Sequence, residues 1–174
     1  NTGQTCVCAN RIYVQEKVHE EFCKKFIEEV SKMKVGDGLN EENSSGPMID
    51  EHSLTKVEEH VEDAIQYGAK VAIGGSRHAL GMNFYQPTIL TGVSSEAKIT
   101  TEETFGPVAP IYKFKDENEV IELANNSPFG LASYFYSRDI GRIWRVAEAL
   151  EYGMVGVNTG LTSKAEAPFG GIKE

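Results

Sequence analysis

Apolar residues recur every three or four positions in four segments of the chain, which is the period of an amphipathic helix. The first segment covers residues 18–33 and ends just before a Gly-Asp-Gly turn. The second covers residues 53–67 and stops at Gly68, a residue type suited to helix C-termini. A third begins near Asp116, and a fourth follows Ser137. The pattern therefore predicts four helices, each with one face turned toward a core.

Short apolar runs separate these helices, and several of them are rich in β-branched or aromatic residues, which predicts strands. The runs are residues 11–15, 70–73, 88–90, 109–114, 131–136 and 154–157. Strands that alternate with helices imply crossover connections between parallel strands. We therefore expect a three-layer α/β fold, a mainly parallel sheet with helices on both faces. The length of 174 residues predicts a single domain over residues 1–174.

Composition and charge narrow the classes of partner. The formal net charge of −9 argues against binding to nucleic acid or to an anionic membrane surface. No apolar run approaches the roughly 20 residues that span a bilayer. Three cysteines are an odd number without framework spacing, which favours a reducing compartment and hence a cytoplasmic location.

Cys6 is the most reactive candidate, because it follows a Gly-Gln pair at the head of a predicted helix. Only the thiolate attacks carbonyls, and the N-terminus of a helix favours negative charge through its dipole and its free N–H groups. The same N–H groups are suited to hold an oxyanion. The alternative is that Cys6 fills a small apolar space, as free cysteines commonly do.

The remaining cysteines and the histidines carry weaker signals. Cys8 is a possible redox partner, since a disulfide to Cys6 would switch off the nucleophile, and the alternative is that Cys8 packs inward. Cys23 lies near the apolar face of the first helix, which indicates a structural role. The histidines show no ligand or triad pattern, and we expect them at surface positions: His19, His52, His60 and His78. The spacing of these residues predicts no metal site.

Three motifs, in order along the chain, resemble the signature segments of the aldehyde dehydrogenase superfamily. They are residues 1–6 (NTGQTC), 102–107 (EETFGP) and 167–173 (APFGGIK). Shorter matches at residues 35–38, 46–47 and 84–88 extend the similarity over the whole chain. Residues 5–10, 144–148 and 156–161 most resemble succinate-semialdehyde dehydrogenases. The resemblance implies the catalytic-domain fold of that superfamily and oxidation of a small-molecule aldehyde with NAD or NADP.

The resemblance also implies roles for individual residues. Cys6 matches the nucleophile, whose thiohemiacetal passes hydride to the nicotinamide and leaves a thioester for water to hydrolyse. Glu103 matches the carboxylate that binds the nicotinamide ribose, with a solvent-facing acid as the alternative. Phe105 matches the aromatic residue beside the nicotinamide and Phe169 a wall of the substrate tunnel, while core packing is the alternative for both. Ser163 matches the serine that binds the far carboxylate of succinate semialdehyde.

The resemblance also implies that this chain is one part of a larger enzyme. We expect the dinucleotide-binding domain, the oligomerisation strand, the general-base Glu and an oxyanion-binding Asn to lie outside it, so that the isolated chain is inactive. The parent enzyme is expected to be a homo-oligomer. Two alternatives remain: a non-catalytic binding or structural module that retains the motifs, and a dehydrogenase for another aldehyde.

Overall fold

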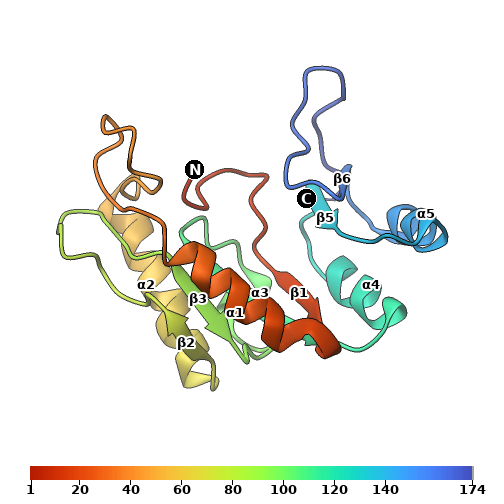
Figure 1. Ribbon diagram of the computed structural model, residues 1–174, viewed down its shortest axis with the longest axis horizontal. Coiled ribbons are helices and arrows are strands. Elements are labelled where there is room, and N and C mark those ends of the chain that lie inside the picture. Colours follow the sequence, from red (N-terminus) through yellow and green to blue (C-terminus); the bar gives the residue numbers. More distant parts are fainter. Residues whose placement is uncertain (174) are drawn as a thin grey trace. The chain divides into compact units, whose positions relative to one another are not determined.

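The computed structural model describes residues 1–173 and divides into two compact units (Figure 1). The first unit contains Asn1–Thr5 and Asn10–Lys113, and the second contains Cys6–Ala9 and the chain from Phe114 onward. Compact units need not fold independently, so the expectation of one domain over residues 1–174 stays a prediction.

A four-stranded sheet forms the centre of the first unit. Its strands lie in the order β1 (Ile12–Gln15), β4 (Val108–Phe114), β3 (Thr88–Thr91) and β2 (Lys70–Ile73). β3 and β4 are parallel, whereas β2 lies antiparallel to β3. Residues 74–87, all of them described, contain no helix that could carry the chain back across the sheet, so β2 pairs as an antiparallel edge.

Helices cover both faces of this sheet, as the burial of two neighbouring residues of β3 shows. Ile89 and Leu90 are both fully buried, because successive side chains of a strand point to opposite faces. Ile89 packs in the cluster that includes Cys23 of α1 (His19–Val30), and Leu90 packs in the cluster with Leu54 of α2 (Glu51–Gln66). The predicted three layers and the mainly parallel sheet with helices on both faces are confirmed.

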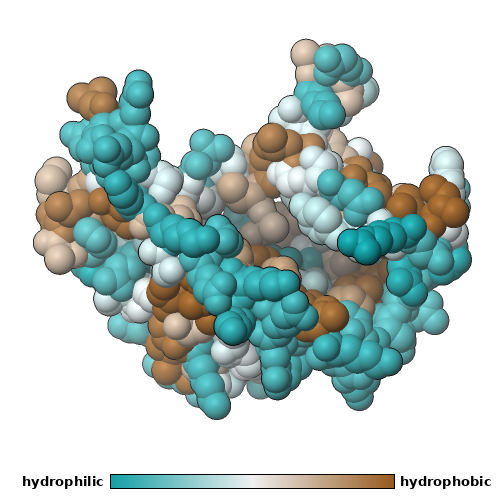
Figure 2. All heavy atoms as spheres, viewed as in Figure 1, coloured by the Kyte–Doolittle hydropathy of each residue, from teal (hydrophilic) through white to brown (hydrophobic). Residues whose placement is uncertain are grey.

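The predicted helices are present, and most begin at a side-chain cap. Asp50 accepts from the Ser53 N–H at the start of α2, and a 3-10 turn, η1 (Glu16–Val18), precedes α1. The short helix α3 (Lys98–Thr101) was not predicted, since four residues are too few to show a period of 3.6. The outward side of α1 is largely hydrophilic, as expected for an amphipathic helix (Figure 2).

The second unit contains α4 (Glu117–Asn125), β5 (Ala132–Phe135), α5 (Ile140–Ala149) and β6 (Met154–Val157). β5 and β6 are parallel, and α5 provides the crossover that parallel pairing requires. Glu117 accepts from both Arg142 and Arg145, which lowers the pKa of its carboxyl group to about 2 and ties α4 to α5. Among the described residues, no helix is long and apolar enough to cross a membrane.

Candidate functional site

The first residues of the chain are anchored in the first unit by a glutamine and a glycine. The side-chain amide of Gln4 donates to the Pro47 carbonyl at 3.1 Å and accepts from the Ile49 N–H at 2.9 Å. Gly3 has a φ of 72°, and a Cβ atom on it would lie 1.9 Å from the carbonyl oxygen of Gly106. Only glycine fits this conformation and this contact, so the two residues fix the path of the chain that leads to Cys6.

The second motif, residues 102–107, forms a loop between α3 and β4 of the same unit. Thr104 and Gly106 are buried, whereas Glu103 is half-buried and the Phe105 side chain is 37% exposed. Phe105 has a φ of 55°, a left-handed conformation that costs a non-glycine residue about 1–2 kcal/mol. Burial of the alternate residues thus leaves Glu103 and Phe105 accessible to a ligand.

Cys6 lies in a turn and not at the start of a helix. Residues 1–10, all of them described, contain no helix, so the predicted help from a helix dipole is wrong. Thr2 and Gly3 both have positive φ, which a right-handed helix cannot accommodate, and the few residues before β1 are too short for a stable helix. Cys6 is exposed and Cys8 half-buried, and neither forms a disulfide.

In the second unit, the hydroxyl of Tyr134 on β5 joins the cysteine-bearing turn to the loop after β6. It donates to the Val7 carbonyl at 2.7 Å and lies 3.1 Å from the hydroxyl of Thr162. Ser163, the next residue, is exposed, and Phe169 further along the loop is 56% exposed. One side chain therefore links the residue next to Cys6 with the residue next to Ser163.

A sequence model of the aldehyde dehydrogenase family matches residues 1–174. The chain belongs to this family. It is 57% identical over 173 residues to the succinate-semialdehyde dehydrogenase (NADP+) GabD of Escherichia coli K12, an alignment that covers 99% of this chain and 36% of the relative. It is 56% identical over 174 residues to the 3-sulfolactaldehyde dehydrogenase of Pseudomonas putida, with 100% of this chain and 36% of that relative covered.

Solved structures of the family agree with the fold. The crystal structure of a succinate-semialdehyde dehydrogenase from Burkholderia pseudomallei matches with a TM-score of 0.97 at 56% identity, over 99% of this chain and 36% of that one. The chain thus spans about a third of the length of the relatives that it matches.

The family motifs fall into two groups within the two units. In the first unit, Gly3 of the first motif contacts Gly106 of the second, the motif that also holds Glu103 and Phe105. In the second unit, Cys6 of the first motif shares its unit with the loop that holds Ser163 and Phe169. The sequence placed these residues in one site by resemblance alone, and the contacts within each unit were not visible in it.

Two histidines do not lie at the surface as predicted. His60 is 2% exposed on α2 and His19 is 7% exposed at the start of α1, whereas His52 is exposed and His78 is half-buried. His60 follows Val57 by three residues on the apolar face of α2, and this spacing was the signal that could have indicated its burial. Burial lowers the pKa of both buried imidazoles, which keeps them neutral.

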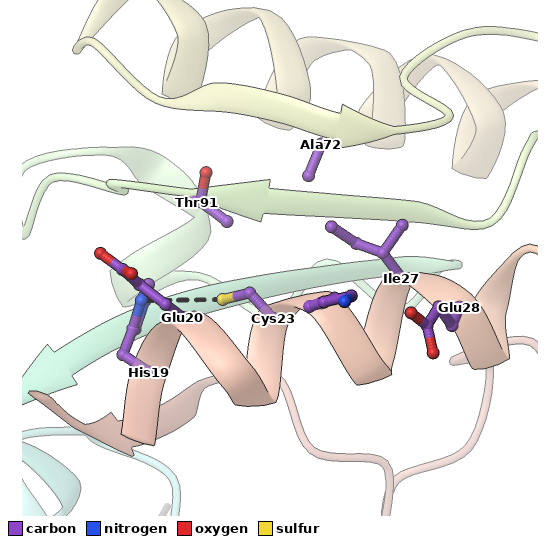
Figure 3. A pocket seen from close by; sticks show the side chains of 8 residues that line it. His19, Glu20, Cys23, Ile27, Glu28, Ala72 and Thr91 are labelled. Carbon is purple, nitrogen blue, oxygen red and sulfur yellow. Dashed lines mark hydrogen bonds between the residues drawn. The ribbon is translucent and has the colours of Figure 1, made fainter. Parts of the chain in front are cut away.

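An open cavity of about 530 Å³ lies between α1 and the edge of the sheet, and none of its lining residues belongs to a family motif (Figure 3). His19 and Cys23 point toward each other there, with the thiol sulfur 3.7 Å from His19 Nε2. Burial raises the pKa of the Cys23 thiol and so disfavours its reactive thiolate form, which fits its predicted structural role. Among residues 1–173, no three His, Cys, Asp or Glu side chains gather as a metal site would require.

Proposed function

We propose that this chain supplies the cysteine-bearing catalytic part of an NAD(P)-dependent aldehyde dehydrogenase that oxidises succinate semialdehyde to succinate. The observation that carries the proposal is the exposed Cys6 thiol in a turn whose approach is fixed by Gly3 and Gln4. The family membership of the chain and the names of its relatives support the class of reaction.

In the proposed reaction, the Cys6 thiolate forms a C–S bond to the aldehyde carbon, and the carbonyl oxygen becomes an oxyanion held by backbone N–H groups. Bound NAD(P)+ would accept the hydride that leaves this carbon, and the oxyanion collapses to a thioester on Cys6. Water then breaks the C–S bond, which releases the carboxylate product and restores the thiol. Glu103 and Phe105 suit the nicotinamide end of the cofactor, because a carboxylate accepts two hydrogen bonds from a diol and an exposed ring can face a planar group.

The substrate proposal rests on a chemical feature shared by the relatives' substrates. Succinate semialdehyde carries a carboxylate at the end opposite the aldehyde, and 3-sulfolactaldehyde carries a sulfonate there. A bound anion needs hydrogen-bond donors, and the exposed hydroxyl of Ser163 is the donor that we assign to it. Phe169, exposed on the same loop, provides apolar contact for the short carbon chain.

The proposed activity and substrate can be tested with a chimera in which the present chain replaces the matching segment of the E. coli relative. It should oxidise succinate semialdehyde with a kcat/KM about 10²-fold above that for butanal, since a site built around an anion rejects a ligand without one. Ser163→Ala should remove most of this preference while the rate with butanal stays the same. If the chimera has the same unfolding temperature as the E. coli relative, and is therefore folded, but oxidises no aldehyde, the chain is a non-catalytic module. A preference for butanal would contradict the substrate alone.

We also propose that Cys8 is the redox partner of Cys6. One peroxide would oxidise the two thiols to a disulfide and be reduced to two molecules of water, which removes the nucleophile. Mass spectrometry after mild peroxide treatment should show a loss of about 2 Da in the peptide that holds both cysteines. An unchanged peptide mass would assign Cys8 to inward packing, with which its partial burial also agrees.

We propose a reducing, cytoplasmic compartment for the enzyme, because none of its three described cysteines forms a disulfide. From the family resemblance, we also propose that the enzyme is a homo-oligomer.

A further inference from the structure

The imidazole of His60 connects α2 to both residues that flank Glu103. Its Nδ1 lies 3.0 Å from the hydroxyl oxygen of Thr104, and its Nε2 lies 3.3 Å from Oε2 of Glu102. His60 is 2% exposed and Thr104 is 4% exposed, so the contact with Thr104 is shielded from water. No family motif in the sequence contains His60.

The chemistry of the three groups fixes the direction of these hydrogen bonds. An ionised carboxylate only accepts, so Nε2–H of His60 donates to Glu102. A neutral imidazole then has Nδ1 free to accept, and the Thr104 hydroxyl donates to it. Burial lowers the pKa of His60, and the nearby Lys56 and Lys98 act in the same direction against the opposing effect of Glu102. The neutral ring therefore satisfies both neighbours at once.

The other contacts of this loop leave the side chains of Glu103 and Phe105 to ligands. The Glu102 N–H donates to the Lys98 carbonyl at 2.8 Å, and the Thr104 N–H donates to the side-chain oxygen of Asn10 at 3.4 Å. The latter bond is long, so the side-chain contact with His60 is the better-formed anchor of Thr104. Removing it would free the loop on both sides of Glu103.

We propose that His60 is a positioning residue for the nicotinamide cofactor, which acts through Glu102 and Thr104 to hold the Glu103 carboxylate toward the ribose. This inference rests on the proposed function, because it takes Glu103 as a cofactor ligand. If His60 had a purely structural role, its substitution would lower the stability of the unit and change the affinities for the cofactor and for the aldehyde to the same extent.

The first test measures hydrogen exchange in the chain itself and needs no activity. In His60→Leu, the amides of Glu102 and Thr104 should exchange about tenfold faster, because loss of the ring's hydrogen bonds lowers the free energy of local opening. His52→Leu, an exposed histidine on the same helix, should leave these amides unchanged. Thr104→Val keeps the side-chain shape and removes only the hydroxyl, so it replaces His60→Leu if that variant does not fold. Unchanged exchange in the folded variant would overturn the proposal.

The second test measures steady-state kinetics in the chimera. His60→Leu should raise the KM for NAD(P)+ about tenfold and leave the KM for succinate semialdehyde within about twofold. His60→Gln, which keeps an N–H donor for Glu102, should recover part of the loss. Equal changes in both KM values, or none in either, would overturn the positioning role. If the unsubstituted chimera oxidises no aldehyde, the proposed function fails, whereas the exchange result still reports on the His60 anchor.

Discussion

Cys6→Ala is expected to lower the dehydrogenase activity of the chimera by at least about 10³-fold, because every step of the proposed reaction depends on the Cys6 sulfur. Alanine cannot form the C–S bond, and the other two cysteines are less accessible than Cys6: Cys8 is half-buried and Cys23 is buried. The turn around Cys6 depends on Gly3, Gln4 and the Tyr134 bond to the Val7 carbonyl. None of these contacts uses the thiol, so the substitution should leave the fold intact. The measurement is the initial rate of NAD(P)H formation from succinate semialdehyde.

Cys23→Ala is the matched control for this loss. It removes a thiol from the apolar cluster beneath α1, so we expect a lower unfolding temperature and activity within about threefold of the unsubstituted chimera. Iodoacetamide should label Cys6 faster than Cys23, because burial raises the pKa of the Cys23 thiol. If Cys6→Ala keeps full activity with an unchanged unfolding temperature, the nucleophile lies elsewhere and the proposed mechanism is wrong.

The sequence predicted the elements of the fold well because their signals are local. The spacing of apolar residues located the major helices, and the apolar runs located the strands to within a residue or two. The direction of β2 was not predictable in this way, because a strand has the same alternation whichever way it runs. Its antiparallel pairing follows from the helix-free connection in residues 74–87.

The candidate site was less predictable, since its conformation depends on contacts between distant residues. Cys6 was expected at the head of a helix, but Gln4 bonds to residues more than 40 positions away and the chain turns instead. His60 was expected at the surface, but its ring meets Thr104, 44 positions along the chain. A local pattern cannot show such pairs. The motif resemblance named Glu103 and Phe105, and the contacts in the structure indicate how their loop is held.

Gly3→Ala is the second substitution for which we expect a large effect, about 10²-fold in kcat, the loss typical of a reacting group displaced by about 1 Å. The added Cβ would lie 1.9 Å from the Gly106 carbonyl oxygen, and a φ of 72° is itself unfavourable for alanine. Gly106 cannot retreat easily, because a Cβ on it would already lie 2.4 Å from a methyl carbon of Val57. The chain before Cys6 must therefore shift, and the two hydrogen bonds of Gln4 weaken with it.

Gly38→Ala provides the control, since a Cβ atom there meets nothing within 4 Å and the residue has no positive φ. We expect its kcat to stay within about twofold of the unsubstituted chimera, because a surface substitution without strain changes stability little. The two variants differ from the parent by the same single methyl group, so a difference in kcat between them reports the contact of Gly3 with Gly106. Equal kcat values for both variants would mean that a shift of the residues before Cys6 does not affect catalysis. The contact of Gly3 with Gly106 would then not be needed to position the nucleophile.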